Sequence, residues 1–131
     1  MSAHFDKVTG FLHDLNLKII ETQEDQELVI VEDQDSGISN LIVDCEHPIL
    51  VLEQPVMLTP KNPGDLFKRL LQMNSDLVHG AYVLSQDSSL ILWRDTLQLD
   101  NLDLNELEGS ITALSLGLAE HAAELLKFAK S

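Results

Sequence analysis

Four strand-like segments follow one another with only two to five residues between them, and no other feature limits the fold as strongly. They cover residues 17–22, 27–32, 38–46 and 49–57, and the gaps hold turn-forming residues or the His47-Pro48 pair. Parallel neighbours need a connection of about a dozen residues or more, usually a helix. Because these gaps are too short for one, we predict an antiparallel meander of three or four strands.

A helix is predicted on each side of this meander. Residues 3–15 follow Ser2 as the expected N-cap and carry apolar residues at steps of three and four. The second helix, residues 63–75, is expected to begin at Pro63, with Asn62 as its N-cap. Two adjacent apolar rows mark this helix: Leu66, Phe67, Leu70, Leu71 and Met73.

A β-hairpin and a long helix complete the expected order. Residues 80–85 and 89–96 are two strand-like segments around a polar turn. The last 29 residues keep apolar side chains at helical spacing throughout, which predicts a helix roughly 40 Å long. We expect part of this length to contact a partner subunit, because a globule of 131 residues does not need it. Gly109 and Gly117 within the helix indicate either close packing against another element or simple tolerance.

Composition supports one α+β domain over residues 1–131. With 44% hydrophobic residues, a chain of this length can form a core without disulfides or a metal. The 8 Lys and Arg against 22 Asp and Glu give a net charge of −14, which argues against binding to nucleic acid or anionic membranes. The single Cys45 cannot form an intramolecular disulfide, and no signal-peptide pattern opens the chain, so a cytoplasmic location is expected. No apolar run approaches the length of a membrane span.

The sequence shows no catalytic, metal-binding or cofactor-binding motif. None of the five histidines stands three or four residues from another histidine or a cysteine, as metal sites commonly require. His121, on the apolar side of the last helix, is expected to be a hydrogen-bonded core or interface residue, with a proton switch at a dimer seam as the alternative. A hydrolase that uses Asp44 or Glu46 beside His47 is the competing enzymatic hypothesis. We predict a protein that is not an enzyme and needs no cofactor.

Acidic residues are concentrated in two stretches that contain no Lys or Arg. Residues 19–60 hold ten Asp and Glu residues, and residues 95–126 hold seven. Two interpretations fit this pattern. The acids form a solvated surface around the meander, or they form a face that receives a basic, partly unfolded partner.

Three segments carry a resemblance to known families. They are Leu70-Leu71-Gln72-Met73-Asn74 in the second helix, His79-Gly80-Ala81-Tyr82-Val83-Leu84 in the hairpin, and residues 90–103 before the long helix. With the order of elements, they resemble the type III secretion chaperone fold, the CesT/Tir chaperone-like group, and the related YbjN-like family of bacterial sensory transduction regulators. The order of elements matches along nearly the whole chain, and the sequence match covers about residues 63–128.

This resemblance implies a small acidic homodimer that binds a polypeptide client or a regulatory partner. In such chaperones the second helix and the hairpin region usually make the dimer, which implies an interface of Leu70, Met73, Tyr82, Leu84 and Trp93. Clients cover the first helix and the meander, which implies contact residues Phe5, Val29, Val31 and Leu41. The YbjN-like relatives imply an alternative, a small-molecule-sensing regulator with an enclosed apolar cavity between the sheet and the long helix.

Overall fold

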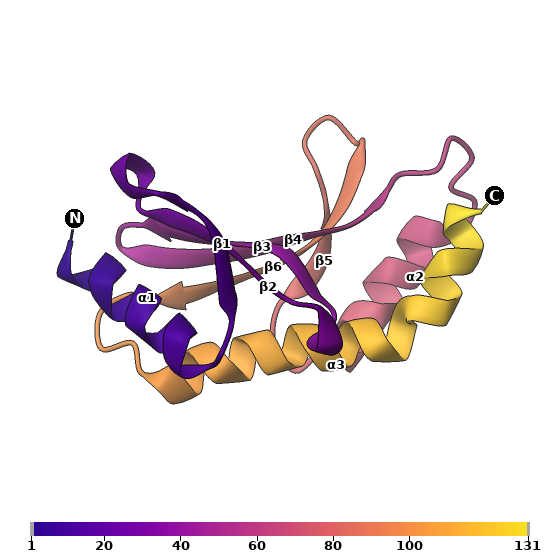
Figure 1. Ribbon diagram of the computed structural model, residues 1–131. Coiled ribbons are helices and arrows are strands. Elements are labelled where there is room, and N and C mark those ends of the chain that lie inside the picture. The colour runs from indigo at the N-terminus through magenta and orange to yellow at the C-terminus, as the bar shows by residue number, and fades with distance from the viewer. Residues whose placement is uncertain (1, 131) are drawn as a thin grey trace.

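The computed structural model describes residues 2–130 and has the α+β architecture expected from the sequence. Its helices are α1 (Ala3–Asp14), α2 (Leu66–Met73) and α3 (Leu104–Ala129), with short 3₁₀ helices η1 (Glu24–Gln26), η2 (Gln34–Ser36) and η3 (Asn74–Asp76). The strands are β1 (Lys18–Gln23), β2 (Leu28–Asp33), β3 (Ile38–Glu46), β4 (Ile49–Leu58), β5 (Ala81–Leu84) and β6 (Leu90–Gln98). Figure 1 shows the helices on one side of the sheet.

The predicted meander is confirmed, and it contains all four strands. β1, β2, β3 and β4 pair antiparallel in chain order. Along β3, Leu41, Val43 and Cys45 are buried, whereas the intervening Ile42 and Asp44 face the other side of the sheet. This period of two gives the sheet an inner face toward the helices and an outer face away from them.

The hairpin is confirmed too, but it is not a separate unit. β6 pairs with β4 along its full length, from Ile49 opposite Gln98 to Leu58 opposite Leu90. The sheet order is therefore β1-β2-β3-β4-β6-β5, with β1 and β5 at the edges. This long pairing explains why β6 continues to Gln98, beyond the predicted end at residue 96.

The start of α2 differs from the prediction. The helix begins at Leu66, with Asp65 as its N-cap, and neither Asn62 nor Pro63 occupies the predicted position. Gly64 has a φ of 54°, in the left-handed region, so the helical conformation cannot run through it. The second helix is consequently two turns long, and η3 replaces its predicted last residues.

α3 passes beneath the sheet and continues to the side of α2 (Figure 1). A Cβ atom at Gly117 would lie 2.4 Å from Cδ2 of Leu77, so close packing is the one of the two interpretations that applies to this glycine. At Gly109 a Cβ would lie 3.7 Å from the ring of His79, an ordinary contact distance. The contacts with both the sheet and α2 use much of the helix length within the chain itself. No helix within residues 2–130 is long and apolar enough to cross a membrane.

Candidate functional site

The four residues predicted to face a client lie in the core. Phe5 of α1 packs in the same buried cluster as Val29, Val31 and Leu41 of the meander. Val29, Val31 and Leu41 lie on the inner face of the sheet, which faces the helices, and Phe5 is among the buried residues of α1. A segment seated on the surface of the folded chain would not reach them, and their role in binding stays a prediction.

The five predicted dimer residues divide into two groups. Leu70, Met73, Tyr82 and Trp93 are buried within the chain. Leu84 is exposed, and it lies at the end of the edge strand β5. As with the client residues, their role in an interface stays a prediction.

The sequence pattern did not reveal which apolar row of α2 is exposed. One row, Leu66, Leu70 and Met73, is buried, and the adjacent row, Phe67 and Leu71, faces outward. Leu71 is 74% exposed. Both rows were visible in the sequence, but only the packing of α2 against the rest of the fold decides which one remains available to a partner.

A groove lies between the end of β4 and the last turns of α3. Its volume is about 270 Å³. Every residue that lines it is apolar: Val56, Met57, Leu118, Ala122, Leu125, Leu126 and Ala129. Leu126 is 59% exposed at this groove, and Leu58 at the end of β4 is 77% exposed. Exposed apolar side chains around an apolar hollow are typical of a site that receives apolar side chains of a partner.

The segment from α2 to β5, residues 66–84, is fixed to the fold by named side-chain contacts, and we call it the α2–β5 corner. The Asn74 side chain bonds both backbone groups of Tyr82: its Oδ1 accepts from the Tyr82 amide at 2.7 Å, and its Nδ2 donates to the Tyr82 carbonyl at 3.4 Å. Since β5 is an edge strand, these backbone groups have no strand partner on that side. Asn74, the last residue of the first resemblance segment, thus takes the place of a neighbouring strand.

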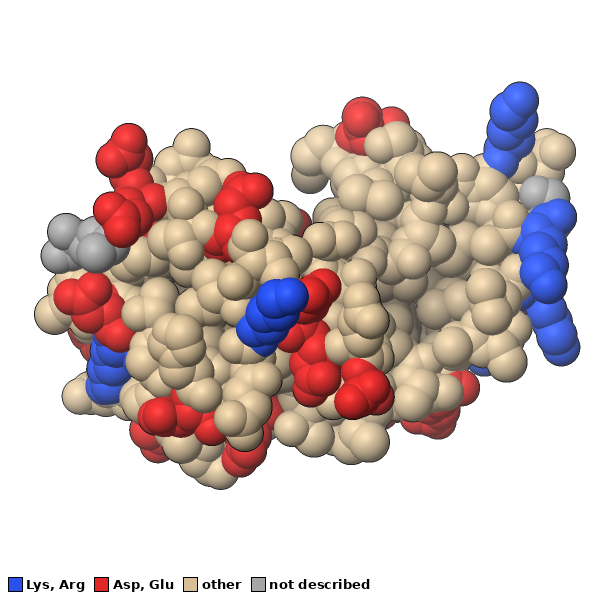
Figure 2. Space-filling view, in the orientation of Figure 1, with Lys and Arg blue, Asp and Glu red and all other residues tan. Residues whose placement is uncertain are grey.

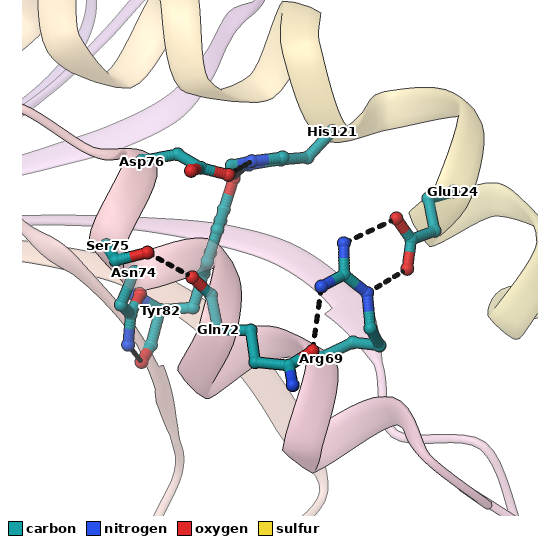
Figure 3. Close-up of polar contacts among 8 residues, drawn as sticks. All are labelled: Arg69, Gln72, Asn74, Ser75, Asp76, Tyr82, His121 and Glu124. Atoms are coloured by element: carbon teal, nitrogen blue, oxygen red, sulfur yellow. Dashed lines mark hydrogen bonds and ion pairs between the residues drawn. The ribbon is translucent and has the colours of Figure 1, made fainter.

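His121 of α3 is the buried polar centre of this corner. Its Nδ1 is 2.7 Å from the hydroxyl oxygen of Tyr82, and its Nε2 is 3.1 Å from Oδ2 of Asp76 (Figure 3). Burial, the main cause, and the nearby carboxylates of Glu120 and Asp76 together raise the pKa of Tyr82 to about 12. Tyr82 therefore keeps its hydroxyl proton at neutral pH. The expectation of a hydrogen-bonded core histidine is confirmed.

An ion pair joins α2 to α3 beside this histidine. Nε of Arg69 donates to Oε2 of Glu124 at 2.5 Å, and Nη2 donates to Oε1 at 2.8 Å (Figure 3). This two-point hydrogen bonding lowers the pKa of Glu124 and raises that of Arg69. Both side chains are partly exposed, so the pair orients the two helices more than it stabilises them.

On the acidic outer face of the meander, His47 of the hydrolase hypothesis has Glu27 as its hydrogen-bond partner, a residue that the hypothesis did not include. Nε2 of His47 lies 2.7 Å from Oε1 of Glu27, and this hydrogen bond is the main cause of the low pKa of Glu27, about 2. Desolvation raises the pKa of Asp44 to about 6, with further contributions from Glu46 and Glu53. His47 is thus engaged by Glu27, while Asp44 lies among other carboxylates.

The charged residues are distributed unevenly over the surface. Figure 2 shows acidic side chains spread over much of the face in view, a group of basic side chains at the end near the C-terminus, and further basic side chains near the middle and at the opposite end. Lys68 and Arg69 lie on α2, and Lys127 lies in the last turn of α3. The meander, by contrast, has Lys18 at its first position and no other Lys or Arg.

Comparisons with known proteins agree with this fold. Among curated protein sequences, none matches the chain significantly. The solved structure of YbjN from E. coli, described as a transcription regulator, has 17% identity over 92% of each chain and a TM-score of 0.70. The HopA1-SchA chaperone–effector complex has 14% identity over 88% of this chain and 91% of that one, with a TM-score of 0.62.

A third structure is the Yersinia pestis type III secretion chaperone SycH in complex with a fragment of YscM2. It has 19% identity over 86% of this chain and 93% of that one, with a TM-score of 0.60. At these identities the likeness concerns the fold. The model of the CesT_Tir_1 family matches residues 1–131. Since this match covers the whole sequence, the chain belongs to the CesT_Tir_1 family.

Proposed function

We propose that this protein binds an extended segment of another polypeptide, without catalysis, and that it does so as a homodimer. The observation that carries the proposal is the apolar groove between β4 and α3, with Leu126 and Leu58 exposed beside it. Similar folds are solved with a polypeptide partner, in the SchA complex with HopA1 and the SycH complex with a YscM2 fragment. Together, the groove and these solved complexes support a role in binding a polypeptide.

The charge of the chain favours a client of particular chemistry. A net charge of −14 repels acidic segments and attracts basic ones. We therefore propose a client segment that combines apolar side chains for the groove with Lys or Arg for the acidic surface. Large side chains such as Trp93, Leu52 and Leu114 are buried in the core, whereas the groove opens at the surface, so the geometry favours binding of a segment at the surface over binding of a small molecule in the interior.

For the homodimer, we propose the outer row of α2 as the contact. Phe67 and Leu71 are exposed on a helix that also carries Lys68. This side is less acidic than the meander, so two copies of a strongly acidic chain can approach each other there with less repulsion. On β5 we propose Leu84 as a further dimer contact, because it is the exposed residue among the predicted dimer positions.

Binding is tested with three labelled extended peptides: one alternates Leu with Lys, one alternates Leu with Glu, and one alternates Ser with Lys. We expect fluorescence anisotropy to show binding of the Leu-Lys peptide alone. Leu126→Glu is expected to weaken this binding by about tenfold or more, because it places a charge in the apolar groove. The matched control is Leu116→Glu, an equally exposed position of α3 outside this groove. Equal binding by the Ser-Lys peptide, or by the Leu126→Glu variant, would contradict the groove assignment.

The oligomeric state is tested by light scattering behind a sizing column. We expect twice 14.6 kDa for the wild type and 14.6 kDa for Leu71→Glu. Leu58→Glu, which changes an equally exposed leucine away from α2, is expected to remain a dimer. A monomeric wild type at tens of micromolar would remove the dimer from the proposal.

A further inference from the structure

Three potential ligand atoms converge at the α2–β5 corner. His121 offers Nε2, and Asp76 and Glu120 each offer a carboxylate oxygen, with all three atoms within 4.8 Å of one another. Two of them come from consecutive residues of α3, and the third comes from η3. In Figure 3 Asp76 and His121 point toward each other.

The ring of His121 is oriented so that Nε2 faces the carboxylate of Asp76. Its side chain is buried, and Nδ1 is engaged by the Tyr82 hydroxyl at 2.7 Å. A hydroxyl can donate or accept a hydrogen bond, so Tyr82 remains paired with Nδ1 whether or not that nitrogen carries the proton. When Nδ1 carries it, Nε2 presents its lone pair toward the carboxylates. Metal-ligating histidines are commonly oriented by such a hydrogen bond at their other nitrogen.

The carboxylates of Asp76 and Glu120 are exposed, and that of Glu124, which lies nearby, is bound by Arg69. Asp76 and Glu120 are open to solvent, which leaves room for a water molecule in a further coordination position. Glu124, one helical turn after Glu120, has both carboxylate oxygens engaged by Arg69. Because Arg69 engages both carboxylate oxygens of Glu124, Asp76 and Glu120 are the carboxylates that converge on the His121 ring.

We propose that His121, Asp76 and Glu120 form a binding site for a divalent transition-metal ion, with zinc as the ion to test. One imidazole and two carboxylates suit zinc, whereas calcium and magnesium prefer oxygen ligands alone. Tetrahedral zinc with bonds of about 2.0 Å needs ligand atoms about 3.3 Å apart. The His121–Asp76 pair already satisfies this at 3.1 Å, and the exposed Glu120 can approach by a change of rotamer.

The site would join η3 to α3 through the ion. η3 precedes the loop that leads to β5, and Leu77 of that loop packs against Gly117. A bound ion would therefore hold the α2–β5 corner against α3 without any further contact. This inference goes beyond the proposed polypeptide binding and does not depend on it.

The experiment is calorimetric titration of zinc chloride into the full chain at pH 7, with four proteins compared. They are the wild type, Glu120→Gln, Asp76→Asn and the control Glu106→Gln, which removes the same charge from an exposed position on the first turn of α3. We expect one zinc per chain in the wild type and in the control. Loss of a ligand is expected to weaken the affinity by about tenfold or more in the other two.

A second measurement identifies the ligand atom. In long-range ¹H–¹⁵N NMR spectra, zinc is expected to shift the Nε2 signal of His121 and to leave the other four histidines unchanged. Absence of zinc binding at millimolar concentration would overturn the proposal. So would unchanged affinity in both Glu120→Gln and Asp76→Asn, because the ion would then be bound elsewhere. Circular dichroism of Glu120→Gln, an exposed substitution, verifies that its loss of binding is not a loss of fold.

Discussion

The meander and the α2–β5 corner use the same two local devices in different surroundings. Each contains a glycine with left-handed backbone: Gly37 has a φ of 74° and Gly80 a φ of 75°. Each also contains a side-chain amide that both donates to and accepts from backbone groups. In the meander this amide is Gln54, which accepts from the Ser39 amide at 3.0 Å and donates to the Gly37 carbonyl at 3.1 Å. In the corner it is Asn74, bonded to the backbone of Tyr82.

In the meander the glycine is open and the amide is buried, whereas in the corner the glycine is tightly packed and the amide is only partly buried. A Cβ at Gly37 would have no heavy atom within 4 Å, whereas a Cβ at Gly80 would lie 2.6 Å from the ring of the buried Trp93. The amides show the reverse order, because Gln54 is buried and Asn74 is only partly buried. The comparison teaches that a local conformation or hydrogen bond gains its energetic weight from the packing around it.

The largest expected effect separates the two glycines. Gly80→Ala is expected to destabilise the protein by about 3 kcal/mol, from backbone strain and from the collision with Trp93. Gly37→Ala imposes the strain alone and is expected to cost about 1 kcal/mol. Urea unfolding monitored by circular dichroism measures both. Equal losses in the two variants would show that the packing of Trp93 against Gly80 contributes nothing.

The next effect separates the two amides in the opposite direction. Gln54→Ala removes a buried side chain together with its bonds to the Ser39 amide and the Gly37 carbonyl, and it is expected to cost about 2 kcal/mol. Asn74→Ala exposes the Tyr82 backbone at a sheet edge, where water can replace the lost bonds, and is expected to cost about 1 kcal/mol. Urea unfolding of the two variants measures both losses of stability. A larger loss in Asn74→Ala would mean that the corner, and not the meander, depends more on its amide.

The smallest expected effect concerns one carboxylate of the meander. The pKa of Asp44 is raised from 3.8 to about 6, so its ionised form disfavours folding at neutral pH. Asp44→Asn is therefore expected to stabilise the protein at pH 7 by about 1 kcal/mol after solvent screening. The gain should fall as the pH drops through about 6 toward 3.8, since the wild-type group then becomes neutral in the folded state too.

The corner supplies the control for this prediction. Glu124→Gln removes a carboxylate whose pKa is lowered by Arg69, so it is expected to destabilise the protein at pH 7. Because the pair is partly exposed, the loss should shrink in high salt. Stability curves at several pH values and two salt concentrations test both variants. A destabilising Asp44→Asn would contradict the view that desolvation and the neighbouring carboxylates disfavour the ionised form of Asp44 in the folded protein.

The sequence predicted the meander well because its signals are local. Short gaps exclude crossovers, and alternation along segments such as residues 38–46 identifies the inner face without knowledge of any partner strand. The same is true of α1 and α3, whose apolar rows recur over several turns. The start of α2 was predicted wrongly because a preference of Pro63 for the first helical turn was overruled by the left-handed conformation of Gly64.

The candidate sites were less accessible to the sequence because their members are far apart in the chain. Tyr82 and Asp76 stand 39 and 45 residues from His121, and no spacing rule connects them. Phe67 and Leu71 were recognised as apolar, but a helix with two apolar rows does not reveal which row its own chain will cover. The groove between β4 and α3 has the same origin, since its walls come from elements separated by α2 and the hairpin.

By itself the sequence determined the order of elements, the antiparallel meander, the acidic surface and the length of α3, since these follow from the spacing of residue types along one segment. Only the tertiary structure decided that β6 joins β4, that Leu71 and Leu126 remain exposed, and that His121 meets Asp76 and Tyr82. The physical reason is that side-chain burial and polar pairing between distant segments depend on how whole elements pack, and packing is a property of the assembled core.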